Sequence, residues 1–236
     1  MTNAILGFDT ATPDVAVAVV EGDDVLAERN LAPPPEGRPR HATMLLATIE
    51  DLVSATGGWE RIERIAVGVG PGSFTGLRIG ITTATSLAYA RSLPLAGVSS
   101  LAALAAGIST GRDSAPPCLP VIDARRGEAF AALYQGNEGE GAVWGPSVLS
   151  PAELAMAAEQ APTGTRAAGD GALRFRAELE AAGIEVQPDG DEAHRLSARY
   201  VCRLSAGAAA QATPPQPAYL RQPDAKLWRE RDLGNP

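Results

Sequence analysis

Short apolar runs separated by turn residues open the chain. Ile5 to Phe8, Val15 to Val20 and Val25 to Leu31 are rich in aliphatic residues. The segments between them, Asp9 to Asp14 and Gly22 to Asp24, carry the Asp, Pro and Gly residues that favour turns. Three strands at this spacing predict an antiparallel meander.

Helical spacing follows a proline-rich segment at 32–40. Met44, Leu45, Ile49 and Leu52 recur on one face of a predicted helix, which ends at Gly57-Gly58. The next elements alternate between strand and helix. They are a strand at 65–69, a glycine-rich turn at 70–76, a helix at 77–91, a strand at 95–98 and a helix at 99–107.

The second half begins as the first half does. After a polar break at 110–117, Leu119 to Ile122 leads to Asp123, just as the opening strand leads to Asp9. A strand at 128–134 and helices at 151–160, 173–182 and 198–212 follow. The pattern predicts a duplicated α/β unit with two lobes, one at 1–107 plus 218–236 and the other at 108–217.

Charge and composition narrow the functional classes. The 236 residues carry a formal net charge of −8, so the chain lacks the overall basic surface that grips nucleic acid alone. The two cysteines and the two histidines are isolated in the sequence, which predicts no metal site. The N-terminus lacks the features of a signal peptide, and no apolar run reaches membrane length, so we expect a cytoplasmic protein.

The glycine-rich segment from Gly70 to Gly80 is the strongest local signal. A strand that feeds a glycine-rich turn and then a helix can place backbone amides around an anion. The alternative is a plain tight turn. The nucleotide or anion loop that this predicts contains Asp9, Thr10, Gly72, Ser73 and Thr75, although Asp9 and Asp123 fit simple turn residues better.

Four segments in order resemble the TsaB (YeaZ) family. They are Phe8 to Thr12, Gly70 to Gly80, Val121 to Phe130 and Pro217 to Arg221. The resemblance implies the actin-like ASKHA fold, an α/β fold with two RNase H-like lobes whose mixed sheets are flanked by helices.

The resemblance also implies a role in tRNA modification without catalysis by this chain. The catalytic relative, TsaD, holds metal with a His-x-x-x-His pair, but here Leu45 stands four positions after His41. The implied role is to activate TsaD, which transfers threonylcarbamoyl from its adenylate to N6 of adenosine 37 in tRNAs that read ANN codons. TsaE would dock on the pair, and tRNA would bind through the complex.

The chain would need no cofactor of its own, and whether nucleotide binds at the interface with TsaD stays open. The alternative is an independent small-molecule kinase or peptidase of the actin-like superfamily. The second half lacks a glycine-rich phosphate loop, which argues against the kinase.

A stripe of small residues suggests where a partner could bind. Gly76, Gly80, Ala84 and Ala88 recur every fourth residue, which permits close approach of another helix or of the lobe's own sheet. The family resemblance favours a helical bundle with TsaD, with Met44, Leu45, Ile49 and Leu52 adding area from the first helix. The same face would join two copies into a homodimer when the chain is alone.

Overall fold

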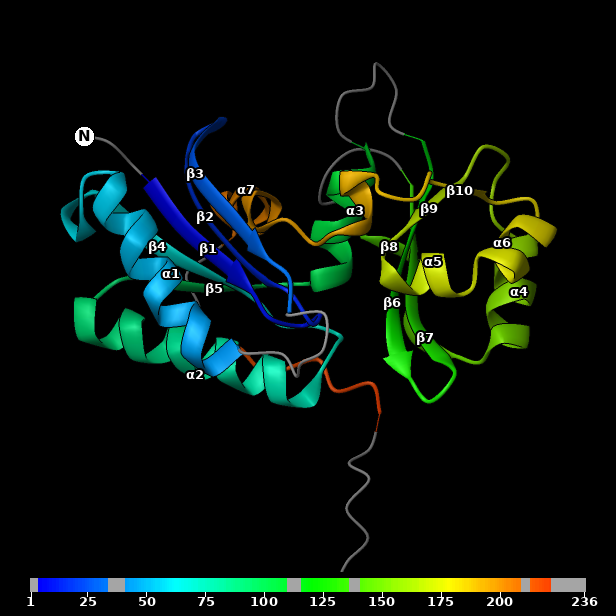
Figure 1. The fold of residues 1–236 in the computed structure, drawn as a ribbon, viewed down its shortest axis with the longest axis horizontal. Helices are drawn as coiled ribbons and strands as arrows, with labels where there is room; N and C mark the ends of the chain where they lie inside the picture. Colours follow the sequence, from blue (N-terminus) through cyan, green and yellow to red (C-terminus); the bar gives the residue numbers. More distant parts are fainter. Residues whose placement is uncertain (1–3, 34–40, 110–115, 136–140, 209–212, 222–236) are drawn as a thin grey trace, which may run out of the picture.

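The chain forms two lobes that lie side by side, each built on a five-stranded sheet (Figure 1). This computed structural model describes residues 4–33, 41–109, 116–135, 141–208 and 213–221. Among these residues, no helix is long and apolar enough to cross a membrane.

The first sheet has the order β3-β2-β1-β4-β5. The central strand β1 pairs antiparallel with β2 and parallel with β4. Its apolar run is buried on both faces, so Leu6 and Phe8 face one layer of helices and Ile5 faces another. The strands are β1 (Ala4–Asp9), β2 (Val15–Glu21), β3 (Asp24–Leu31), β4 (Ile62–Gly68) and β5 (Leu95–Val98).

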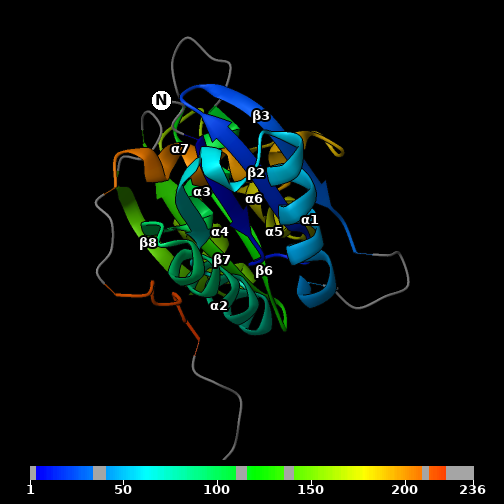
Figure 2. The same ribbon diagram turned by 90° about the vertical axis from the view of Figure 1, so that its left-hand side faces the viewer.

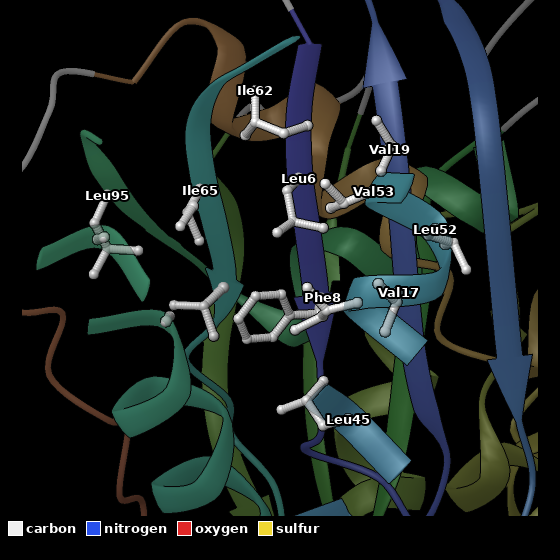
Figure 3. Close-up of a cluster of buried hydrophobic side chains, with 14 of the residues drawn as sticks. Leu6, Phe8, Val17, Val19, Leu45, Leu52, Val53, Ile62, Ile65 and Leu95 are labelled. Carbon is white, nitrogen blue, oxygen red and sulfur yellow. The ribbon is translucent and has the colours of Figure 1, made fainter. Parts of the chain in front are cut away.

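Three helices cover this sheet. Helices α1 (His41–Ala55) and α2 (Phe74–Arg91) pack on one face, in front of the sheet in Figure 2. Figure 3 shows Leu45 of α1 near Phe8 and Val53 of α1 near Leu6, and Leu52 belongs to the same core. Helix α7 (Ala198–Ala206) covers the opposite face, where Val201 and Cys202 are completely buried.

The second sheet repeats the topology of the first. Its order is β10-β9-β6-β7-β8, and the central strand β6 is again antiparallel to one neighbour and parallel to the other. The predicted duplication and the two-lobed α/β fold are therefore confirmed. The strands are β6 (Cys118–Arg125), β7 (Glu128–Tyr134), β8 (Ala142–Leu149), β9 (Arg166–Ala168) and β10 (Glu185–Val186).

The second lobe departs from the predicted elements at strands β8, β9 and β10 and at one helix. Strand β8 was not foreseen, because Gly145-Pro146 interrupts its apolar pattern. The helix expected at 173–182 is two short helices, α5 (Asp170–Arg174) and α6 (Arg176–Ala181), separated at Phe175. Helix α4 (Pro151–Glu159) begins with a capping box between Ser150 and Glu153, and two 3₁₀ turns span Trp59–Arg61 and Glu192–His194.

Helix α3 joins the two lobes. This helix (Ser100–Ser109), assigned to the first lobe up to residue 107, packs through Ala103 and Ala106 in a core of the first lobe and through Leu101 and Leu104 on the second sheet. Helix α7, assigned to the second lobe, packs on the first sheet. The sheet on which each helix packs is set by the apolar surface that the finished fold leaves uncovered. The order of the elements along the chain does not reveal this. The helix expected at 198–212 is shorter than predicted, since α7 ends at Ala206 with Gly207 as its C-cap, and residues 209–212 lie outside the described residues.

Candidate functional site

A cleft of about 690 Å³ lies between the lobes. The loop after β1 and the first turn of α2 form one wall, and the β6–β7 hairpin forms the other. Residues 218–221, from the last described segment, close a third side. The lining is mostly apolar, with arginine side chains and the carboxylates of Asp123 and Asp170 among it.

Asp9, at the end of β1, is enclosed by its own lobe. Its Oδ2 accepts a hydrogen bond of 2.6 Å from the Ser100 hydroxyl, and its Oδ1 accepts one of 2.6 Å from the Ala11 amide. Burial raises the pKa of Asp9 to about 6, and these hydrogen bonds act against that rise. The carboxylate therefore organises the β1 loop and is not directed at a ligand in the cleft.

The glycine-rich turn is occupied by the chain itself. The Ser73 amide donates to the Ala11 carbonyl at 2.7 Å, and the Thr10 hydroxyl donates to the Gly76 carbonyl at 2.8 Å. A Cβ on Gly72 would lie 2.4 Å from the Ala11 oxygen, and one on Gly76 would lie 2.0 Å from the Thr10 oxygen. The glycines are thus needed for close approach of the β1 loop to α2.

The same contacts involve the residues of the predicted anion loop. The fold does bring Asp9, Thr10, Gly72, Ser73 and Thr75 together. However, the polar groups of Asp9 and Thr10 are bound within the lobe, and the Ser73 side chain caps α2 by accepting from the Gly76 amide at 3.2 Å. Of the five, Ser73 and Thr75 are exposed residues of the cleft lining.

Asp123 takes the corresponding place in the second lobe. Arg174 donates to both of its oxygens, at 3.1 and 3.0 Å, and the Arg125 side chain donates to Oδ2 at 3.2 Å. Its backbone amide donates to Asp170 at 2.9 Å. Burial raises the pKa of Asp170, against the lowering effect of that hydrogen bond. Two guanidinium groups therefore compensate Asp123, which fits the turn-residue interpretation.

Both histidines serve the packing of loops. His41 Nε2 lies 3.1 Å from the Pro13 carbonyl, beside the first turn of α2. His194 Nδ1 lies 3.2 Å from Gly169 and belongs to the second lobe. Within the described ranges, no group of three or more His, Cys, Asp or Glu side chains is arranged to hold a metal.

The small-residue stripe lies in the interior of the first lobe. Leu45, Ile49 and Leu52 of α1 and Ala84 of α2 are buried in one hydrophobic core with the sheet. Gly76 and Gly80 face Thr10, and Met44 is only partly buried. The expectation that these residues form an exposed apolar face is therefore wrong, because the sheet and the β1 loop already cover them.

Different residues occupy the outer side of these helices. Leu46 of α1 is 54% exposed and Tyr89 of α2 is 89% exposed. Thr82 and Ser86 lie on the exposed side of α2 between Arg78 and Tyr89. Sequence periodicity could have identified this side, since it is the complement of the buried stripe.

Sequence reasoning also missed an aromatic pair at the mouth of the cleft. The rings of Phe74 and Tyr219 stack with centroids 5.0 Å apart, and the Arg78 guanidinium lies 5.1 Å from the centre of the Phe74 ring. The two rings belong to two of the segments that resemble the TsaB family, Gly70 to Gly80 and Pro217 to Arg221. Their separation in sequence hid their contact.

Comparison with known proteins identifies the family. A family model described as TsaD, tRNA N6-adenosine threonylcarbamoyltransferase, matches residues 27–226. The tRNA threonylcarbamoyladenosine biosynthesis protein TsaB of Escherichia coli is 39% identical over 135 residues, which span 57% of this chain and 56% of that protein. An uncharacterized protein of Mycobacterium tuberculosis is 31% identical over 226 residues, covering 95% of this chain and 94% of the relative.

Comparison with solved structures supports the same family. An uncharacterized protein from Pseudomonas aeruginosa with similarity to peptidase YEAZ aligns with a TM-score of 0.73 and 27% identity, covering 93% of this chain and 100% of that one. A ROK hexokinase from Thermus thermophilus, at 16% identity and a TM-score of 0.51 over 86% of this chain and 99% of that one, shares the fold alone. The chain therefore belongs to the TsaB/YeaZ family, within the wider group that the TsaD family model describes.

Proposed function

We propose that this chain is a non-catalytic subunit that binds and activates a TsaD-type enzyme. The pair would transfer threonylcarbamoyl from threonylcarbamoyl-adenylate to N6 of adenosine 37 in tRNAs that read ANN codons. The observation that carries the proposal is the state of the cleft, where both loop carboxylates are engaged by their own lobes. A catalytic or metal-binding carboxylate needs access to its substrate or ion, which these contacts oppose.

The outer side of α1 and α2 is the proposed docking surface for the partner. It presents Leu46 and Tyr89 beside small polar side chains such as Thr82 and Ser86. An exposed large aromatic residue on a helix is a typical interface anchor. The proposed docking surface lies on the same two helices as the predicted one, but it consists of different residues. Two copies could pair through the same surface when the partner is absent.

The remaining roles follow from the same proposal. TsaE would dock on the pair, and tRNA would be held mainly by the other chains, because the net charge of this chain is −8. The chain would act in the cytoplasm and need no cofactor, while a nucleotide could bind where it meets TsaD.

An independent kinase or peptidase is less well supported, because the Asp9 carboxylate is enclosed and the fold likeness to a hexokinase does not extend to sequence.

Reconstitution tests the proposal directly. The chain, its organism's TsaD, and the mixture are each incubated with threonylcarbamoyl-adenylate and an ANN-decoding tRNA. We expect the two proteins to co-purify and the mixture to modify tRNA faster than TsaD alone, with no product from this chain alone. Product from this chain alone, or a TsaD activity that this chain does not change, would refute the proposal.

A further inference from the structure

We propose that the mouth of the interlobe cleft binds one unpaired nucleotide of an RNA strand. The base would stack on Tyr219, and the backbone phosphates would lie at the β6–β7 hairpin, where Arg125 and Arg126 line the cleft. This deepens the proposed function, on which it rests, by giving the chain its own contact with the RNA.

The aromatic pair has the properties of a stacking platform. Phe74 is 47% exposed and Tyr219 is 44% exposed, although both are large rings already in contact with each other. Arg78 lies against Phe74, so a cation and two rings are gathered in one place. Bases stack on such exposed rings and on guanidinium planes in proteins that bind single-stranded RNA.

The platform is held in position before any ligand arrives. The Ala218 amide donates to the Val69 carbonyl at 2.8 Å, on one side of Tyr219. On the other side, Leu220 packs against the core of the second lobe, and Arg221 donates to the Ala124 carbonyl at 3.0 Å. A pre-organised ring loses little conformational entropy when a base stacks on it.

Arginine side chains gather around the cleft, although the whole chain is acidic. Arg78, Arg125, Arg126, Arg174 and Arg221 stand in or beside the cleft, against the carboxylates of Asp123, Glu128 and Asp170. Several arginine side chains are thus gathered around the cleft of a chain whose net charge is −8. Arg125 is the last residue of β6, and Arg126, at φ 55°, begins the turn that joins β6 to β7. The arginines therefore suit contact with a few phosphates.

A free magnesium–nucleotide fits these residues less well. The Ser73 amide of the glycine turn donates to Ala11, and Asp9 and Asp123 are already bound to Ser100, Arg174 and Arg125. The groups that would hold a polyphosphate and its metal are thus engaged, whereas the rings of Phe74 and Tyr219 are exposed at the mouth of the cleft.

The test uses the full chain with its TsaD and a fluorescent anticodon stem-loop RNA that reads an ANN codon. Tyr219→Ala should weaken RNA binding by about tenfold, while Tyr219→Phe, which keeps the ring, should stay within about twofold. Arg126→Asn, chosen because Asn tolerates the left-handed backbone, should weaken binding and lower the slope of log K against log salt by about one. Arg29→Asn, at an exposed arginine on β3 that is not among the residues lining the cleft, should change nothing.

Each variant is first tested for co-purification with TsaD, which Tyr219→Ala should leave intact. If wild type does not pair with TsaD, the proposed function fails, and the RNA contact is tested on the chain alone with a 4-thiouridine RNA. A cross-link to the peptide containing Tyr219 supports the contact, and its absence overturns it. Equal losses for Tyr219→Phe and Tyr219→Ala, or equal competition by AMP and by RNA, would also overturn it.

Discussion

Asp9 ends β1, where its buried carboxylate holds the β1 loop through Ser100 and Ala11. Its pKa is raised to about 6 by burial, so the folded state holds the proton more tightly than the unfolded chain does. The stabilising effect of protonation is complete below about pH 4 and is lost as the pH rises through 6. A change of this size corresponds to roughly 3 kcal/mol.

The corresponding prediction compares wild type with Asp9→Asn by urea unfolding between pH 4 and pH 8. The free energy of unfolding of wild type should fall relative to that of Asp9→Asn across this range, by up to roughly 3 kcal/mol. Other titrating groups are common to both proteins and cancel in the difference. A difference that stays constant with pH would show that Asp9 is accessible and ionises normally.

At the residue scale, the sequence showed which residues have a structural role better than it showed which residues they contact. Asp9 and Asp123 could be recognised as turn residues at strand ends, and the structure gives both that role. The contacts of Asp9 with Ser100, and of Phe74 with Tyr219, join residues far apart in the chain. Such contacts depend on the finished fold, so no local pattern could predict them.

At the scale of elements, the glycines of α2 were read correctly as sites of close approach, but the approaching group is the β1 loop. Alanine is normally preferred to glycine in a helix by about 1 kcal/mol. At Gly76 the added Cβ would lie 2.0 Å from the Thr10 carbonyl oxygen, and backbone atoms cannot move away cheaply. We expect Gly76→Ala to destabilise the protein by roughly 1–3 kcal/mol.

The matched control is Gly207→Ala at the end of α7, where nothing lies within 4 Å of the new Cβ and φ is −86°. Thermal unfolding of the two variants separates the effects. A stabilised Gly76→Ala protein would mean that the β1 loop does not pack against α2.

A charged substitution should destabilise the protein on the buried side of α1 and α2 but not on their exposed side. Ala84→Arg places a cation without a partner in the core, which costs several kcal/mol, so this variant should unfold or melt far below wild type. Leu46→Arg and Tyr89→Arg change exposed residues and should keep the wild-type circular dichroism and melting temperature. If the proposed docking surface is correct, they should nevertheless lose co-purification with TsaD. Normal TsaD binding by both folded variants would place the interface elsewhere.

The elements of the first lobe were easier to predict than those of the second. The strands of the first sheet are apolar runs bounded by Asp, Gly and Pro, and their positions agree with the structure. In the second lobe β9 and β10 span three and two residues, too short to leave a periodic pattern. Their place in the sheet is fixed by pairing with β6 and by the helices that cover them.

At the scale of the whole molecule, the lobes share helices and should lose structure together. Helix α3 packs on the second sheet and also contacts α7, which packs on the first sheet. Two buried thiols can report the unfolding of the two lobes. Cys202 lies in α7, which packs on the first sheet, and Cys118 lies in β6 of the second sheet. Burial raises the pKa of both thiols, so neither should react with an alkylating reagent in the native protein.

Pulsed alkylation over a urea gradient, followed by mass spectrometry of the two cysteine peptides, tests this coupling. Both thiols should become reactive over the same urea range, with free energies of opening that agree within about 1 kcal/mol. The physical reason is that opening either lobe exposes the apolar face of α3 or α7 and removes packing from the other. Labelling of Cys118 well before Cys202 would instead show that the second lobe unfolds independently. In that case the cleft would open at little cost to the first lobe, and the Tyr219 platform would lose the wall against which Leu220 packs.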